Sequence, residues 1–212
     1  MKNEWVLNIG REFGSGGREI GKLAAERLGI PYYDKELIVL AAEKSGMSLD
    51  YLLSLDEQSV SSFLYSFSGG GSFPLGGRLT GHSVLPAADQ LFLSQSEVLR
   101  DIAQKGGAVF VGRCADYILQ NHPKHMNVFI QAPLSQRIKR VMERHDLTAK
   151  AAETLINKTD KNRASYYLHF TGEKWGDRKN FDLVISSAIG IHMAVDLIVD
   201  FYQECQTIGG TK

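Results

Sequence analysis

The chain has 212 residues, of which 43% are hydrophobic, and this composition supports one packed domain and excludes wholesale disorder. Its 24 Lys and Arg balance 24 Asp and Glu, which argues against a protein whose whole surface binds nucleic acid. Residues 111–180 nevertheless hold 13 basic and 7 acidic residues. We expect either an anionic ligand in this third of the chain or a solvated basic helix face.

The cysteines and the N-terminus carry a prediction about location. Cys114 and Cys205 lie far apart, so neither a disulfide framework nor a zinc-binding spacing is expected, and a reducing compartment is favoured. Residues 1–8 lack a signal-peptide pattern, and no apolar run approaches the ~20 residues that span a membrane. We therefore predict a cytoplasmic protein with no membrane partner.

The first predicted elements form half of a βαβ unit. Residues 5–9 are a short apolar run that predicts a buried strand, and residues 10–17 that follow contain four glycines. Apolar residues then recur at helical spacing over residues 18–28, and Gly29 ends this helix. A strand, a glycine turn and a helix in this order favour an α/β fold.

The remaining elements continue the alternation. Strands are predicted at residues 30–33, 108–111, 126–130 and 182–185, and helices at residues 35–44, 48–67, 87–105, 134–145, 149–167 and 192–203. The glycine-rich residues 68–83 are typical of a mobile functional loop or a flexible linker. Five short apolar strands between helices predict one α/β domain, with a parallel sheet covered on both faces and a helical insertion.

The glycine turn has the context of a phosphate-binding loop. Main-chain N–H groups there can close around a phosphate, and the helix N-terminus adds partial positive charge. It is not a regular Walker A motif, because the sixth residue from Gly10 is Ser15 and no Lys-Ser/Thr pair follows; a dinucleotide fingerprint fails at Glu19. Arg11 or Arg18 could replace the missing lysine. The alternative is a structural turn.

Several segments together resemble the cytidylate kinase-like family, which is related to cytidylate kinase within the P-loop nucleoside monophosphate kinases. They are GREFGSGGREI at residues 10–20, LGIPYYDKELI at residues 28–38, Gly112-Arg113 after a predicted strand, Asp160-Lys161-Asn162-Arg163, and FDLVI at residues 181–185. The resemblance covers most of the chain. It implies a single P-loop NTPase domain over residues 1–212, with an acceptor-binding insertion at about residues 35–105 and a lid at about residues 134–167.

The same resemblance implies ATP-dependent phosphorylation of a nucleoside monophosphate, above all CMP or dCMP, with Mg²⁺. The residues implied at the ATP phosphates are Arg11, Gly14, Ser15, Gly16, Gly17, Arg18 and Glu19, with Ser15 as the nearest hydroxyl for Mg²⁺. Those implied at the acceptor are Asp34, Arg113, Asp160 and Arg163, and those in the lid are Arg137 and Arg140. Arg18, Arg137, Arg140 and Arg163 are the expected catalytic residues.

The chemistry agrees with this set of arginines. Phosphoryl transfer needs two substrates held in line, with positive charge around the migrating group. Arg137, Arg140 and Arg144 are spaced to share one face of a predicted helix, although a solvated basic face has the same spacing. Arg113 and Asp34 follow predicted strands, at the sheet edge where ligands bind. An ion pair with Asp116 and helix capping, respectively, are the alternative roles of these two residues.

Two other functions remain open from the sequence. One is a P-loop kinase for another small acceptor, because a fold does not fix a substrate. The other is a nucleotide-binding sensor that lost turnover with the P-loop lysine and binds partners through residues 68–83. Nucleic-acid binding is least expected, because no recognised motif accompanies the basic region. The sequence does not indicate an oligomeric state.

Overall fold

The computed structural model describes residues 4–46, 48, 50 and 87–208. In these residues five parallel strands form one sheet in the order β2-β3-β1-β4-β5. The strands are β1 (Val6–Arg11), β2 (Tyr32–Tyr33), β3 (Ala108–Val111), β4 (His125–Gln131) and β5 (Leu183–Ser186). The predicted parallel sheet is therefore confirmed.

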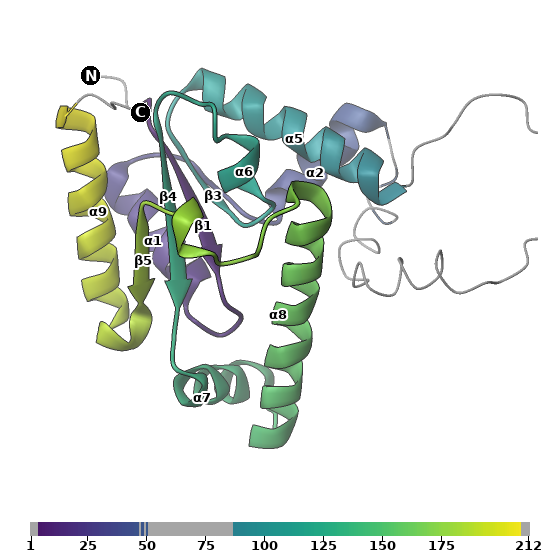
Figure 1. Cartoon of the computed structure of the whole chain (residues 1–212), viewed down its shortest axis with the longest axis vertical. Helices are drawn as coiled ribbons and strands as arrows, with labels where there is room; N and C mark the ends of the chain where they lie inside the picture. Colours follow the sequence, from purple (N-terminus) through teal and green to yellow (C-terminus); the bar gives the residue numbers. More distant parts are fainter. Residues whose placement is uncertain (1–3, 47, 49, 51–86, 209–212) are drawn as a thin grey trace, which may run out of the picture.

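Helices cover both faces of the sheet (Figure 1). One face packs against α1 (Gly17–Leu28) and α9 (Ile191–Ile208), and the other against α2 (Glu36–Ser45), α5 (Ala87–Lys105) and α6 (Ala115–Ile118). Successive side chains of a strand point to opposite faces. Accordingly Leu7 belongs to the cluster with α1 and α9, whereas Val6 belongs to the cluster with α2, α5 and α6. This burial on both faces explains the continuous apolar runs of the strands.

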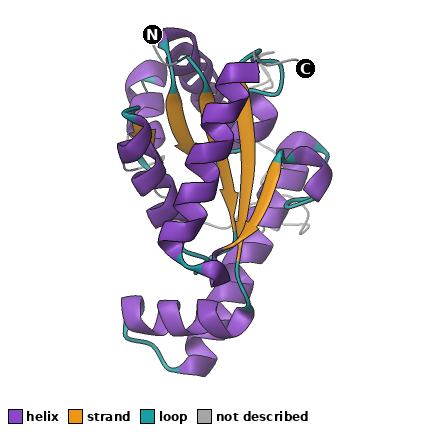
Figure 2. Ribbon diagram, turned by 90° about the vertical axis from the view of Figure 1, so that its left-hand side faces the viewer, coloured by secondary structure: helices purple, strands orange, loops and turns teal. Residues whose placement is uncertain are grey.

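The helices α7 (Leu134–His145) and α8 (Ala149–Thr171) form a hairpin that projects beyond the carboxyl ends of the strands, at the bottom of Figure 2. Thr148 caps α8, because its hydroxyl oxygen accepts a hydrogen bond from the main-chain N–H of Ala151 at 3.3 Å. The hairpin has its own apolar cluster around Val141 and Ile156, and Phe13 of the glycine turn packs against it. The hairpin therefore lies against the loop that follows β1.

Most predicted elements lie within two or three residues of the observed ones. The predicted bounds match for the helices at residues 87–105 and 134–145 and for the strand at residues 108–111. β1 was predicted at residues 5–9, and it starts one residue later, at Val6, and ends two residues later, at Arg11. α6 and the 3₁₀ turns η1 (Arg178–Asn180) and η2 (Ser187–Ile189) were not predicted. Apart from residues 48 and 50, the helix predicted at residues 48–67 lies outside the described residues, as does the loop at residues 68–83.

Within the described ranges, none of the helices has the length and apolar character needed to cross a membrane. The predicted bounds of the acceptor-binding insertion and of the lid remain predictions.

Candidate functional site

The loop between β1 and α1 closes tightly around the helix N-terminus. Gly14 and Gly16 have φ angles of +77° and +84°, a conformation that residues with a side chain rarely adopt. Gly16 is the N-cap of α1, and a Cβ atom there would lie 2.7 Å from Cδ1 of Ile191. The first N–H groups of a helix have no intrahelical acceptor, so this turn directs main-chain donors at the space beside the loop.

Ser15 is buried inside the loop. Its hydroxyl donates to the carbonyl oxygen of Glu12 at 2.9 Å and accepts from the N–H of Gly17 at 3.3 Å. Its own carbonyl oxygen accepts from the hydroxyl of Ser187 at 2.5 Å. The hydroxyl of Ser15, which the resemblance implied as a ligand of Mg²⁺, therefore makes two hydrogen bonds that stabilise the loop. Glu19 is exposed in the first turn of α1.

The hairpin of α7 and α8 holds the loop through Arg137 and Asp160. Nε of Arg137 donates to the carbonyl oxygen of Phe13 at 2.8 Å, Nη1 lies 3.3 Å from the carboxylate of Glu12, and Nη2 pairs with Asp160. Asp160 in turn accepts from the N–H of Phe13 at 2.8 Å. Glu12 also accepts from the N–H of Ala132 at 2.9 Å. These contacts fix the loop on both sides of Phe13.

Arg140 lies one turn further along α7. Its Nη1 donates to the carbonyl oxygen of Gly14 at 3.3 Å and to the hydroxyl of Ser187 at 3.2 Å. Arg144, on the same predicted face, is exposed. The structure thus brings Arg137 and Arg140 to the glycine loop, and their place in a lid and their contact with phosphate stay predictions.

Asp34 is a buried carboxylate directly after β2, surrounded by basic groups. One of its oxygens lies 2.5 Å from Nε of Arg18, and the other lies 3.7 Å from Nη2 of Arg11. Its main-chain N–H donates to the carboxylate of Glu36 at 2.9 Å. The carboxyl ends of β1 and β2 and the first turn of α1 therefore meet at Asp34.

Arg163 on α8 approaches the same place from the other side. Its Nη1 donates to the carbonyl oxygen of Arg11 at 2.9 Å, and its guanidinium lies 5.5 Å from the centre of the Phe13 ring. Burial and the charge of Arg11 lower the pKa of Arg163 to about 9, and burial lowers the pKa of Arg11 to about 10. Both groups stay charged at neutral pH. The site therefore concentrates positive charge that an anion would neutralise.

Arg113 stands on a strained segment at the end of β3. Gly112, Arg113 and Cys114 have φ angles of +77°, +59° and +54°, so three successive residues are left-handed. Such strain costs about 1–3 kcal/mol per non-glycine residue and gathers at functional sites. Gly112, the residue before Arg113, packs against the guanidinium of Arg11, and the charge of Arg113 is one cause of the lowered pKa of Arg11. Arg113 follows β3 and Asp34 follows the neighbouring strand β2, so both residues lie at the carboxyl edge of the sheet.

Two residues that follow Arg113 are buried. Cys114 is one of them, and burial raises the pKa of its thiol. Asp116 is also buried, and its carboxylate accepts a hydrogen bond from the hydroxyl of Tyr167 at 2.7 Å. Asp116 thus has a partner on α8 that the sequence did not suggest.

Sequence reasoning missed three residues that build the loop. Glu12 lies within the glycine turn but gave no sign of its bond to Ala132, directly after β4, and Ser187 lies 172 positions from its partner Ser15. Gly112 leaves space for Arg11, because a Cβ atom there would lie 2.0 Å from Nη1 of that side chain. Their roles depend on long-range packing, so no local pattern could have found them.

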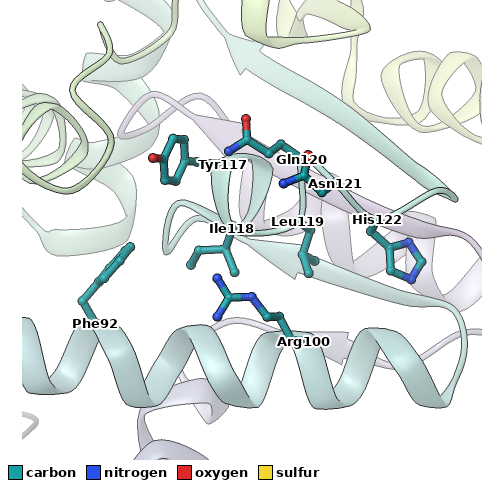
Figure 3. A pocket seen from close by; sticks show the side chains of 8 residues that line it. All are labelled: Phe92, Arg100, Tyr117, Ile118, Leu119, Gln120, Asn121 and His122. Atoms are coloured by element: carbon teal, nitrogen blue, oxygen red, sulfur yellow. The ribbon is translucent and has the colours of Figure 1, made fainter. Parts of the chain in front are cut away.

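A pocket of about 370 Å³ lies between α5 and the segment of residues 117–122 (Figure 3). Its lining includes Phe92 and Arg100 of α5 and His122 before β4. That segment precedes β4, so the pocket lies near the amino ends of the strands, whereas the glycine loop lies at their carboxyl ends. The pocket is therefore separate from the candidate site. Among the described residues, no group of three or more His, Cys, Asp and Glu is placed to hold a metal ion.

A five-stranded parallel sheet, a glycine loop between its first strand and helix, and basic residues at that edge define the P-loop kinase fold. A gluconokinase from Sinorhizobium meliloti has this fold with a TM-score of 0.54, at 12% identity over 96% of this chain and 94% of the other. At that identity the likeness shows the fold alone.

The sequence model of the cytidylate kinase-like family matches residues 6–189, and the chain belongs to this family. A cytidylate kinase of Thermococcus kodakarensis is 27% identical over 88 residues, which are 42% of this chain and 45% of that protein. The chain thus matches less than half the length of this curated relative. An uncharacterized protein from Eubacterium ventriosum is also similar, with 27% identity and a TM-score of 0.68 over 94% of this chain and 98% of that one.

Proposed function

We propose that this protein transfers the γ-phosphoryl group of ATP to a nucleoside monophosphate, with CMP or dCMP as the first choice, and releases ADP. The observation that carries the proposal is the pairing of the buried Asp34 with Arg11 and Arg18 beside a glycine loop, with Arg163 bound to the carbonyl oxygen of Arg11. The family and the similarity to a cytidylate kinase support the nucleotide as acceptor.

The loop fits the phosphates of ATP. Its left-handed glycines let the turn pack closely at the start of α1, because a Cβ atom on Gly14 would lie 3.0 Å from the carbonyl oxygen of Arg137 and one on Gly16 would lie 2.7 Å from Ile191. The N–H groups at the start of a helix are suited to bind an anion. In this proposal Gly14, Ser15, Gly16, Gly17 and Glu19 provide main-chain contacts, and Arg11 and Arg18 provide charge. Mg²⁺, when bound, would neutralise charge on the β- and γ-phosphates. The hydroxyl of Ser15 is engaged within the loop, so the nucleotide's own oxygens would supply most ligands to that ion.

The acceptor would occupy the edge beside Asp34. Arg113 and Arg163 would hold its phosphate, since a guanidinium binds phosphate oxygens in a fork. Asp34 pairs with both Arg11 and Arg18, and its negative charge would reduce the repulsion between these two guanidinium groups when no phosphate is bound. Asp160 acts through the loop, because both of its oxygens contact Phe13 or Arg137.

Arg137 and Arg140 have different positions in this proposal. All three guanidinium nitrogens of Arg137 contact loop atoms or Asp160, so this residue positions the loop. Arg140 is partly exposed and reaches the loop at Gly14, where it would approach phosphate oxygens. We propose that the hairpin of α7 and α8 closes over ATP as a lid, which excludes water from the transfer.

An ADP-release assay with ATP, Mg²⁺ and each nucleoside monophosphate in turn tests the proposal, with a reaction lacking acceptor as control. Turnover selective for CMP or dCMP is the expected result. Turnover only with a small hydroxy acid would show a kinase with another acceptor. ATP binding in calorimetry without turnover on any acceptor would favour a nucleotide sensor.

A further inference from the structure

In the common phosphate loop the first position of the motif is a glycine and the seventh is a lysine. We propose that these two residue types are exchanged here, with Arg11 at the first position and Gly17 at the seventh. The guanidinium of Arg11 then provides the positive charge at the β- and γ-phosphates, and Gly17 leaves the space that the side chain of Arg11 occupies. This inference rests on the proposed binding of ATP and assigns the residue that replaces the missing lysine.

The position of α1 fixes the alignment of the loop. The common motif reads G-x-x-x-x-G-K-[ST], in which the lysine follows the second glycine. Here Gly16 is the N-cap of α1 and Gly17 is its first residue. Counted back five positions from Gly16, the place of the first glycine is held by Arg11, and Gly17 holds the place of the lysine.

The side chain of Arg11 and any side chain at position 17 would need the same space. A Cβ atom on Gly17 would lie 2.5 Å from Cβ and 2.9 Å from Cγ of Arg11, which is closer than atoms of this kind approach. The stem of Arg11 therefore fills the space that a side chain on Gly17 would need. Gly112 leaves space for the other end of the same side chain, because a Cβ atom on Gly112 would lie 2.0 Å from Nη1 of Arg11. A side chain at either glycine would displace Arg11.

The environment of Arg11 also fits an anion. The side chain is 16% exposed, and its guanidinium lies 3.7 Å from Asp34, at a distance too long for a hydrogen bond. Its own main chain is held by strand pairing and by Arg163. Arg18 differs, because its side chain is 50% exposed and its Nε lies 2.5 Å from Asp34. Arg11 is therefore the better-placed inner cation, and Arg18 lies outside it.

Calorimetric titration of the full chain with ATP and with AMP, in Mg²⁺, tests the exchange. Arg11→Ala should weaken ATP binding by about 10–100-fold, the loss of one charged hydrogen-bonding group, while AMP binding changes by less than about threefold. Arg11→Lys should retain part of the ATP affinity. Arg27→Ala, which removes an arginine from the far end of α1, is the matched control.

The pair of variants G17K and R11G/G17K gives the sharper measurement. G17K alone should lower both the unfolding temperature and ATP affinity, because the new side chain collides with the stem of Arg11. R11G/G17K places a glycine at the first position of the motif and a lysine at the seventh, as in the common phosphate loop. This double variant should recover both the unfolding temperature and the ATP affinity. Equal ATP affinity of Arg11→Ala and the wild type, or a double variant no better than G17K, would overturn the exchange alone. A wild-type chain that binds no ATP would overturn both this inference and the proposed function.

Discussion

Asp160 on α8 accepts a hydrogen bond from the main-chain N–H of Phe13 in the glycine loop, 147 positions earlier, at 2.8 Å. Its second oxygen pairs with Arg137, which donates to the carbonyl oxygen of Phe13. The helical hairpin thus binds Phe13 on both sides of its main chain. Any movement of the hairpin is therefore coupled to the shape of the loop.

Asp160→Asn should loosen this link. The amide keeps one acceptor for Phe13 but loses the charge that pairs with Arg137. We expect a loss of about 2 kcal/mol in the free energy of unfolding, measured by urea denaturation, and weaker ATP binding in calorimetry. Asp146→Asn, at an exposed left-handed residue of the same hairpin, is the control. Identical behaviour of the two variants would contradict the role given to Asp160.

Ser187→Ala should destabilise the loop from the opposite side. The change leaves the carbonyl oxygen of Ser15 without its buried donor and removes one acceptor of Arg140. We expect a loss of about 1–3 kcal/mol in the free energy of unfolding. Thermal unfolding with and without ATP is the measurement, and Ser135→Ala at an exposed position of α7 is the control. An unchanged ATP-induced stabilisation would show that the loop does not depend on Ser187.

Arg18→Ala and Arg163→Ala should separate the two halves of the proposed reaction. Arg18 lies at the first turn of α1, so its loss should weaken ATP binding or lower turnover by ~10²–10³-fold if it contacts the transition state. Arg163→Ala should mainly raise the KM of the acceptor. Steady-state kinetics with each substrate varied in turn measures both. If both variants keep full activity, these site assignments are wrong.

Asp116→Asn should change how stability depends on pH. Burial, with the nearby charge of Glu173 as a smaller cause, raises the pKa of Asp116 above its ordinary value of 3.8, while the hydroxyl of Tyr167 acts the opposite way. The folded chain therefore holds this proton more tightly than the unfolded chain. The resulting stability is present below pH 3.8 and is lost as the pH rises through the raised pKa.

The amide of the Asp116→Asn variant does not titrate. The free energy of unfolding of this variant, relative to wild type, should consequently increase between pH 4 and pH 7. Urea denaturation of both proteins at several pH values across this range measures the difference. A constant difference would mean that Asp116 has the same pKa in the folded and unfolded chains.

The sequence by itself determined the class of fold and the chemical character of the site. Apolar runs and helical spacing are local properties, so the strand at residues 108–111 and the helix at residues 134–145 were predicted at their observed bounds. The glycine turn between the first strand and helix located the loop for the same reason. The charges needed around a phosphate were visible as arginines, although their partners were not.

The tertiary structure decided which of these residues meet. The strand order places β1 between β3 and β4, which brings Gly112 against Arg11 and Ala132 against Glu12. Asp160 and Ser187 bind the loop across 147 and 172 positions of chain. Such contacts depend on how packed elements are arranged in space, and that arrangement leaves no periodicity in the sequence. For this physical reason the choice of Arg11 over Arg18, as the proposed substitute for the P-loop lysine, could be made only from the folded chain.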